Sequence, residues 1–322
     1  MKLKEYLHRA RMTPDSGDKI EYMSLRDKMA SNALVNSQRN TPGVACNYEA
    51  DVTRLLAVFE SLKKRCDYRL TLNALLTKIL VEGLKEAPRL NAHFVYNHLS
   101  TSGRLIIKEH IDVSMAVCLQ ESKTFQIKIM HLEDKTLKET ALLIEDAKRR
   151  LQNTDLNDVM YEVSRQRLIG ELTHGRVLTP FCQAVRACFG KGKVIRLSQS
   201  LKSDFLKLTG KKPFYAPDGL KPEELNEGSV CFTNWGTLYD NLNTNITYVP
   251  PVYPQVFLFG VGRTAEKEHI LKDENGNLQL ATKKILPLSL VFDHKIGGAA
   301  DIMPFIKKLD EIFANPEIIL TW

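Results

Sequence analysis

The sequence predicts an α+β protein with two layers, in which helices pack on a mixed β-sheet. Its 322 residues, 43% of them hydrophobic, are enough to bury the core of one large domain or two ordinary ones. Helical and strand-like segments follow one another without the regular alternation of a doubly wound parallel sheet. The most apolar run, ILPLSLVF at 285–292, has the length and composition of a buried strand.

The first half of the chain is expected to hold helices and then strands. Apolar residues at spacings of three and four predict a helix over 19–38, which turn residues at 40–43 end. Alternation predicts a strand at 44–52, and Thr71 is placed to cap a helix that stops at Pro88. Extended runs rich in β-branched or alternating residues follow at 105–111, 112–119 and 124–130.

The second half begins with a helix at about 136–152 and returns to strands near its end. Further helical patterns, separated by Gly-rich and Lys-rich breaks, reach residue 217, and a turn with a short capped helix occupies 216–228. A final helix is expected from about Ala300 to Ala314. Strands are expected at 229–236, 245–249, 255–262 and 283–293, with a hairpin turn around 273–278.

Hydropathy and cysteine usage predict a soluble protein of the cytoplasm or an equivalent reducing compartment. No apolar run approaches the roughly 18 residues of a membrane span, and the first fifteen residues have no apolar signal-peptide core. The six cysteines show no C-x-x-C pair, so they are interpreted as reduced and mostly buried thiols. They are Cys46, Cys66, Cys118, Cys182, Cys188 and Cys231.

The net charge of +7 is concentrated in one segment. Residues 153–217 hold eleven Lys or Arg against five Asp or Glu, an excess of six positive charges. A patch of this kind suits an acidic partner domain, a phosphorylated cofactor or a nucleic acid, or it is simply a solvated helix surface. The pattern does not choose among these, although a nucleic acid is the least expected partner.

Local motifs exclude several classes of enzyme chemistry. The G-x-G sequences at 189–193 and 260–263 complete neither a dinucleotide fingerprint nor a phosphate loop, and no zinc-protease or hydrolase motif occurs. No metal site is predicted. Seven of the eight histidines stand among polar or charged neighbours and receive no role: His8, His93, His98, His110, His131, His174 and His269.

The eighth histidine, His294, lies where the strand at 283–293 meets a pair of glycines and the final helix. The segment VFDHKIGGAADIMPFI at 291–306 resembles the active-site segment of the dihydrolipoyl acyltransferases, the core components of the 2-oxoacid dehydrogenase complexes. Their usual pattern is F-D-H-R-x-x-D-G-A-x-x-A-x-F-L. The residues in register are Phe292, Asp293, His294, Lys295 in place of Arg, Ala300, Asp301 and Phe305.

The resemblance extends to other segments in the same order along the chain. Residues 218–236 resemble the family's D-G-K-L-x-x-E-E-L-x-G-G-T-F-T-I-S-N-L-G segment, and 250–263 resemble its N-P-P-Q-x-A-I-L-G-V-G-R segment. The helix and strand from Met23 to Val58 have the layout of the family's first core elements. Together the similar segments cover about 20–152 and 218–322.

This resemblance implies a chloramphenicol-acetyltransferase-like domain that forms trimers or larger assemblies, with active sites at subunit interfaces. The implied reaction moves an acyl group between coenzyme A and a thiol such as dihydrolipoamide. An imidazole with a pKa near 6.5 suits removal of a proton from a thiol with a pKa near 8.5, so His294 is the candidate base. The family's oxyanion-stabilising hydroxyl falls on Thr233, which would come from the neighbouring subunit. Asn234, Asp293 and Lys295 are the candidate substrate-channel residues.

Two features depart from the family pattern. The family has Asp or Asn four residues after the histidine, where this sequence has Gly298, so the role of that carboxylate is lost or taken by another group. The basic helical segment at about 153–217 interrupts the core, and it could be a lid, a docking surface or an assembly contact. The expected organisation is an N-terminal arm at 1–19 and a core domain at 20–322 with this insertion.

Two functions remain open at this point. One is a CoA-dependent acyltransferase that uses acyl-CoA as a substrate and acts on a lipoyl carrier in another chain, because no lipoyl attachment site is recognised in this one. The other is a catalytically impaired homologue that serves as an oligomeric scaffold or interaction subunit. Retention of both His294 and Thr233 favours the enzyme, and a lipoyl-bearing or acidic partner would bind through the basic segment.

Overall fold

The computed structural model describes most of the chain and divides it into two compact units. The larger unit comprises 31–164 and 213–322, and the smaller comprises 1–30 and 165–212. Much of the expected N-terminal arm and insertion lies outside the described residues, so the predicted domain organisation stays a prediction. The described residues are 14–15, 17–97, 100–120, 123–173, 181–182, 185, 187–189, 193, 203–207, 209, 216, 218–236, 247–272 and 277–322.

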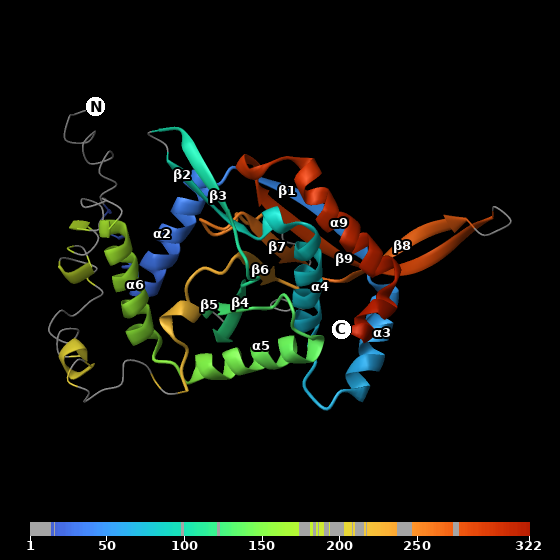
Figure 1. Cartoon of the computed structure of the whole chain (residues 1–322), viewed down its shortest axis with the longest axis horizontal. Coiled ribbons are helices and arrows are strands. Elements are labelled where there is room, and N and C mark those ends of the chain that lie inside the picture. The colour runs from blue at the N-terminus through green and yellow to red at the C-terminus, as the bar shows by residue number, and fades with distance from the viewer. Residues whose placement is uncertain are drawn as a thin grey trace. The chain divides into compact units, whose positions relative to one another are not determined.

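A mixed sheet forms the centre of the larger unit, with the strand order β1-β9-β7-β6-β4-β5 (Figure 1). The pairs β4–β6 and β6–β7 are parallel and the others are antiparallel, and β8 pairs with the outer part of β9. Its strands are β1 (Gly43–Asp51), β4 (Val113–Gln120), β5 (Lys123–Ile129), β6 (Val230–Asn234), β7 (Phe257–Val261), β8 (Ala265–Lys272) and β9 (Leu278–Asp293). A separate hairpin joins β2 (Ala92–Asn97) to β3 (Ser102–Ile107).

The described residues also form the following helices. The α-helices are α2 (Leu25–Asn40), α3 (Thr53–Arg65), α4 (Leu72–Glu86), α5 (Leu137–Gln152), α6 (Leu156–Thr173) and α9 (Ala299–Ala314). The 3-10 helices are η1 (Pro88–Leu90), η2 (Pro222–Glu224), η3 (His294–Ile296) and η4 (Pro316–Thr321). The expected α+β architecture with a mixed sheet is therefore confirmed.

The core lies between the sheet and helix α4, which packs against α5 and α9 (Figure 1). Thr71 caps α4 as predicted, accepting a hydrogen bond from the Ala74 amide at 3.3 Å. The Phe305 ring of α9 meets that of Phe257 edge-on, with 5.0 Å between centroids. A Cβ atom at Gly83 of α4 would lie 2.5 Å from this ring, so glycine permits the close approach of the two helices.

Three strand predictions need correction. The run at 105–111 leaves the sheet after Ile107, because the Asn91 side chain donates hydrogen bonds to the carbonyls of Lys108 and His110, both at 3.1 Å. β9 begins at Leu278, earlier than expected, because its outer part pairs with β8. Of the strand expected at 245–249, the structure describes residues 247–249, and these residues pair with no strand of the sheet. The turn expected around 273–278 falls largely outside the described residues.

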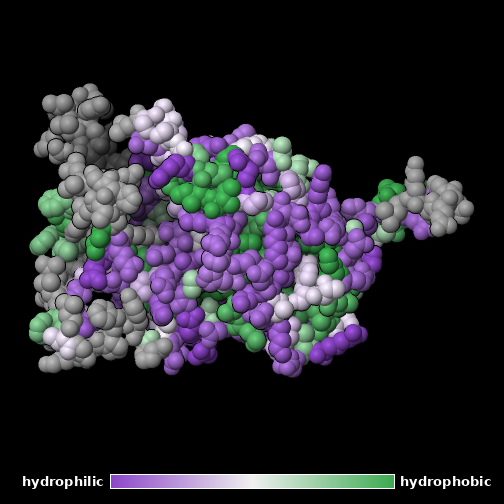
Figure 2. Space-filling model, viewed as in Figure 1, coloured by the Kyte–Doolittle hydropathy of each residue, from purple (hydrophilic) through white to green (hydrophobic). Residues whose placement is uncertain are grey.

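The hairpin of β8 and β9 projects from the sheet as an arm (Figure 1). Hydrophobic residues are visible near its tip in Figure 2. The side chains of Ile270, Leu278 and Leu280 are 69%, 68% and 66% exposed, although Ile270 and Leu280 face each other across the ladder. Such exposure of large apolar side chains is typical of surfaces that contact another protein.

The expectation that the cysteines are mostly buried is wrong for the described residues. Only Cys231 of β6 is buried, and burial raises the pKa of its thiol to about 12, which keeps it protonated and unreactive. Cys46, Cys66 and Cys188 are partly exposed and Cys182 is exposed. None of these five is in a disulfide, in keeping with the predicted free thiols.

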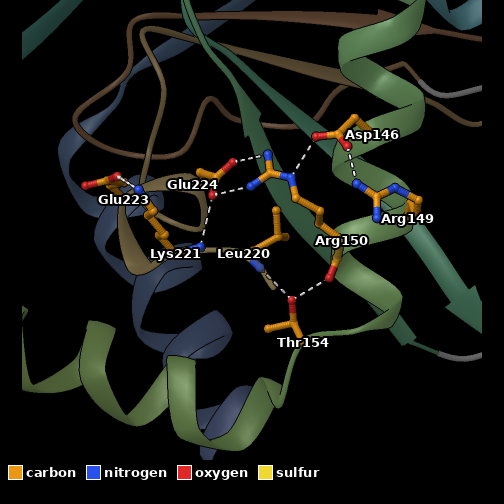
Figure 3. Close-up of polar contacts among 8 residues, drawn as sticks. All are labelled: Asp146, Arg149, Arg150, Thr154, Leu220, Lys221, Glu223 and Glu224. Atoms are coloured by element: carbon orange, nitrogen blue, oxygen red, sulfur yellow. Dashed lines mark hydrogen bonds and ion pairs between the residues drawn. The ribbon is translucent and has the colours of Figure 1, made fainter. Parts of the chain in front are cut away.

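A partly buried ion pair joins the end of α5 to the segment before β6 (Figure 3). Arg150 forms two hydrogen bonds with the Glu224 carboxylate, one of them 2.9 Å, and this contact raises the pKa of the guanidinium. Thr154 donates to the Arg150 carbonyl at 2.6 Å and accepts from the Leu220 amide at 2.8 Å. These contacts hold together the two ends of the segment between 154 and 220, and their free energy offsets the entropic cost of closing so long a loop.

Replacing Glu224 by glutamine should lower the free energy of unfolding by about 2 kcal/mol, because Arg150 would lose a charged partner whose side chain is only 7% exposed. Urea denaturation measures the change. The matched control is Glu223→Gln. The Glu223 side chain is 63% exposed, and its carboxylate is as far as 4.0 Å from the Lys221 ammonium, so we expect the free energy of unfolding to change by less than about 0.5 kcal/mol. Equal effects of the two substitutions would contradict the assigned role.

Candidate active site

His294 begins the 3-10 turn η3 at the point where β9 ends. Its backbone amide donates to the Pro42 carbonyl at 2.9 Å, which ties the turn to the segment before β1. The imidazole is exposed and its centroid is 6.1 Å from that of the Phe292 ring. A fixed backbone and an accessible ring are what a general base requires, because the ring must reach a proton on another molecule.

Asp293 and Lys295, on either side of His294, are bonded to each other. The buried Asp293 carboxylate accepts from the Lys295 amide at 3.0 Å and pairs with its ammonium at 2.8 Å. The same ammonium donates to the Asn40 carbonyl and lies 5.2 Å from the centroid of the Phe94 ring. Both side chains therefore fix the turn within their own chain, and their place in a substrate channel stays a prediction.

The family carboxylate is missing at Gly298, but the Asp301 carboxylate lies beside the same turn. One Asp301 oxygen accepts from the Gly298 amide at 3.0 Å, and the other pairs with Arg89 Nε at 3.0 Å. Arg89 also donates to the Ile296 carbonyl. A Cβ atom at Gly297 would lie 1.9 Å from the Asp301 carboxylate, so glycine is required there, whereas a Cβ at Gly298 would meet no atom within 4 Å.

The arrangement of Arg89, Asp301 and the turn is the feature that sequence reasoning missed. Asp301 is in register with the family motif, but the sequence predicts no role for it. Nothing near Arg89 in the sequence indicates a contact with the turn. Each of them contacts the backbone between Ile296 and Gly298. The pair is thus placed to hold the conformation of the segment that follows His294.

Thr233, the predicted oxyanion donor, lies on β6 and is 8% exposed. It is in register with Gly260 of β7, which in turn is in register with Ser289 of β9. The side chain of the next residue, Asn234, donates to the Asn73 side chain of α4 at 2.6 Å. That contact orients the end of β6, and the predicted channel role of Asn234 stays a prediction.

Within one chain the structure does not bring Thr233 and His294 together. From Ser289 to Asp293, β9 runs about 13 Å, and β6 and β9 are about 10 Å apart, so the backbones of Thr233 and Asp293 are separated by roughly 16 Å. His294 lies one residue farther on. Each functional atom must come within about 3 Å of the atom on which it acts, and two side chains of this length do not span roughly 16 Å between their backbones, so the two residues of one chain do not meet at one reacting centre.

The loop before β7 is held by a polar network around His93. The neutral imidazole of His93 donates from Nε2 to the Gly228 carbonyl at 2.7 Å. The buried side chain of Gln255 donates to the same carbonyl and to Ser114 Oγ, both at 3.1 Å. Ser114 Oγ accepts the Gly228 amide at 2.7 Å. The network joins β2, β4 and the ends of β6 and β7.

Acidification should destabilise this network. Burial is the main cause that lowers the pKa of His93; the charges of Lys108 and Lys128 act in the same direction, while Glu227 and the Gly228 carbonyl oppose it. Below about pH 6.5 the His93 imidazole therefore binds a proton more readily in the unfolded chain than in the folded one. The contribution of the neutral His93 to the free energy of unfolding is present above that pH and is lost as the pH falls below it. Urea denaturation at several pH values measures this effect. The free energy of unfolding should fall less steeply with decreasing pH for His93→Gln than for the parent, and identical slopes would contradict the role of His93.

The sequence model of the family described as 2-oxoacid dehydrogenases acyltransferase (catalytic domain) matches residues 15–162 and 216–321. The chain belongs to this family. The match leaves 163–215 outside it and includes β6, β9, η3 and α9, the elements that carry Thr233 and His294. The match confirms the family that the sequence motifs predict, the 2-oxoacid dehydrogenase acyltransferases.

The acyltransferase relatives are distant. The dihydrolipoyllysine-residue acetyltransferase component of the pyruvate dehydrogenase complex of Acholeplasma laidlawii is 22% identical over 298 residues, covering 91% of this chain and 40% of that protein. The corresponding component of Staphylococcus epidermidis is 24% identical over 313 residues, covering 95% of this chain and 53% of that protein. The chain thus spans about two-fifths to half the length of these relatives.

Solved acyltransferase structures share the fold. The cubic core of the pyruvate dehydrogenase multienzyme complex has a TM-score of 0.60 at 20% identity, covering 96% of this chain and 98% of that one. An Azotobacter vinelandii dihydrolipoamide acetyltransferase, studied for the roles of a serine, a histidine and an asparagine in its catalytic mechanism, has a TM-score of 0.61 at 19% identity, covering 96% and 98%. No helix among the described residues is long and apolar enough to span a membrane.

Proposed function

We propose that this chain is a CoA-dependent acyltransferase that moves an acyl group between coenzyme A and a thiol such as dihydrolipoamide. The observation that carries the proposal is His294: it lies in the family's active-site segment, on a turn held from both sides, with its imidazole exposed. Acyl-CoA is a substrate in this reaction, and the proposed chemistry uses no metal.

The proposed reaction needs one base and one donor to an oxyanion. The imidazole of His294 removes the S–H proton of the acceptor thiol, whose sulfur forms a bond to the thioester carbonyl carbon. The carbonyl oxygen becomes an oxyanion, to which the Thr233 hydroxyl of another copy donates a hydrogen bond. The carbon–sulfur bond to coenzyme A then breaks, and the imidazolium returns its proton to the leaving thiolate.

This reaction requires an assembly of at least two copies, because Thr233 and His294 of one chain are roughly 16 Å or more apart. A closed homotrimer supplies the three equivalent interfaces that such a site needs, and larger assemblies can be built from trimers. The exposed apolar residues of the β8–β9 arm, Ile270, Leu278 and Leu280, are available to contact another copy. A lipoyl-bearing or acidic partner would bind through the basic segment 153–217, in a cytoplasmic setting.

Acyl-CoA consumption with free dihydrolipoamide as acceptor tests the proposal. The intact oligomer, verified by light scattering, should transfer the acyl group to the dithiol and release free coenzyme A, and mass spectrometry of the dithiol should detect the thioester. An intact oligomer that transfers no acyl group from a panel of acyl-CoA donors would contradict the proposal and favour the scaffold function.

Asp301→Asn should lower kcat about tenfold with little change in KM for acyl-CoA. The neutral amide weakens the contact with Arg89 and loosens the turn after His294, and misplacement of a catalytic group slows the reaction more than it weakens binding. Steady-state kinetics measure both parameters. Asp310→Asn is the control, since Asp310 lies on the same helix but bonds to the Tyr48 hydroxyl at 2.6 Å.

Addition of Gly298→Asp to the Asp301→Asn variant separates a positioning role from a general loss of stability. A side chain at Gly298 has space, so this change supplies the carboxylate at the family's usual position. We expect partial recovery of kcat. A lowered kcat in the Asp310→Asn control, or an unchanged kcat in Asp301→Asn, would argue against the positioning role of Asp301.

A further inference from the structure

His110, His131 and Glu133 form a cluster of metal-ligating side chains outside the candidate active site. One potential ligand atom from each residue lies within 4.8 Å of the other two. His110 Nδ1 is 2.6 Å from a Glu133 oxygen, and the two imidazole centroids are 4.3 Å apart with the rings edge to face. Both histidines are exposed and Glu133 is partly exposed, so an ion has access from solvent.

The two loops that carry these residues are fixed where the β4–β5 hairpin opens. Val113 at the start of β4 is paired with Ile129 at the end of β5. His110 precedes the buried Ile111, while the fully buried Leu132 separates His131 from Glu133. Each ligand is therefore adjacent in sequence to a side chain anchored in the core, and the positions of all three follow from the packing of the domain.

Hydrogen bonds between the loops orient the cluster further. The Leu132 amide donates to the Ile111 carbonyl at 3.0 Å, and the Ile111 amide donates to the second Glu133 oxygen at 3.0 Å. The His131 amide donates to Asp112 Oδ1 at 2.9 Å. His131 has a φ of 58°, a left-handed conformation that is uncommon for a residue other than glycine. Backbone bonds of this kind pre-organise a carboxylate and an imidazole for binding an ion.

We propose that His110, His131 and Glu133 bind a zinc-class divalent ion, with Zn²⁺ as the expected metal. Two imidazole nitrogens and one carboxylate oxygen are ligands that Zn²⁺ binds well, and three protein ligands leave a fourth tetrahedral position for water. Mg²⁺ and Ca²⁺ prefer all-oxygen sites, which this cluster does not offer. The bound ion would join the loop before β4 to the loop before α5, independently of the proposed acyl transfer.

An ion pair between His110 and Glu133 accounts for only part of the arrangement. It explains the 2.6 Å contact, since the Glu133 carboxylate raises the pKa of His110. It does not explain why a second imidazole, from His131, lies against the first. A shared cation places both rings and the carboxylate around one centre, whereas an ion pair needs only two of the three groups.

Titration of the 322-residue chain with Zn²⁺ tests the proposal, after chelator treatment and dialysis. Calorimetry should show one equivalent bound per chain, and Co²⁺ in place of Zn²⁺ should give the visible absorption of a tetrahedral nitrogen and oxygen site. Zn²⁺ should also raise the melting temperature, because it binds only the folded site. No bound equivalent and no Co²⁺ absorption would overturn the proposal.

Two variants locate the ion. His131→Asn keeps a residue that tolerates the left-handed conformation, and Glu133→Gln keeps an oxygen for the Ile111 amide, so both should fold and melt like the parent without metal. Each should weaken Zn²⁺ binding at least about tenfold, since even indirect supports of a metal site have effects of that size. His269→Gln on β8 is the control and should bind Zn²⁺ like the parent. Equal Zn²⁺ affinities for parent and cluster variants would place the ion elsewhere and overturn the assignment.

Discussion

Replacing His294 by alanine should lower kcat for acyl transfer by about 10²- to 10⁴-fold, the usual contribution of a general base. The imidazole is exposed, and the conformation of its turn depends on the His294 backbone amide and on the side chains of Asp293 and Lys295. Its removal should therefore leave the melting temperature and the oligomer unchanged. The measurement is single-turnover transfer from acyl-CoA to dihydrolipoamide, with circular dichroism and light scattering on the same preparations.

The control for this substitution is His269→Ala, which removes a histidine on β8, away from the family's active-site segment. It should leave kcat unchanged. Full activity of His294→Ala would exclude His294 as the base.

The elements around the candidate site could be predicted because their signals are local in the sequence. The apolar run of β9, the cap at Thr71 and the helix that begins at Ala299 each depend on residues within a few positions of one another. The placement of His294 at the end of a strand follows from the same local pattern. The family motif then predicts the role of His294 as a base, which periodicity alone does not indicate.

The missed features depend on contacts between distant parts of the chain. Arg89 and Asp301 are 212 residues apart in sequence, yet both contact the turn after His294. His110 and Glu133 meet because β4 and β5 pair, which no local pattern of single histidines reveals. Nothing in the spacing of these residues distinguishes them from ordinary surface charges, so only the folded chain identifies them.

Thr233→Val should lower kcat by about 10²- to 10³-fold, the effect of removing one oxyanion donor in other enzymes. Valine has nearly the shape of threonine, and at this buried position on β6 the change removes a polar atom and adds none, so the fold should tolerate it. KM for acyl-CoA should change little, because the hydroxyl interacts with charge that develops only in the transition state. Single-turnover kinetics measure the loss, and Thr233→Ser, which keeps a hydroxyl, should retain most of the rate.

Mixing two inactive variants decides whether Thr233 acts on its own chain or on a neighbour. An oligomer is assembled from equal amounts of His294→Ala and Thr233→Val chains. A site shared between two chains is then intact wherever a Thr233→Val chain supplies His294 and a neighbouring His294→Ala chain supplies Thr233. Random assembly gives this combination at about a quarter of the interfaces, so co-refolded chains should regain about a quarter of the parent activity. If both residues acted within one chain, every site would carry a lesion and no activity would return. The roughly 16 Å separation along the sheet predicts recovery.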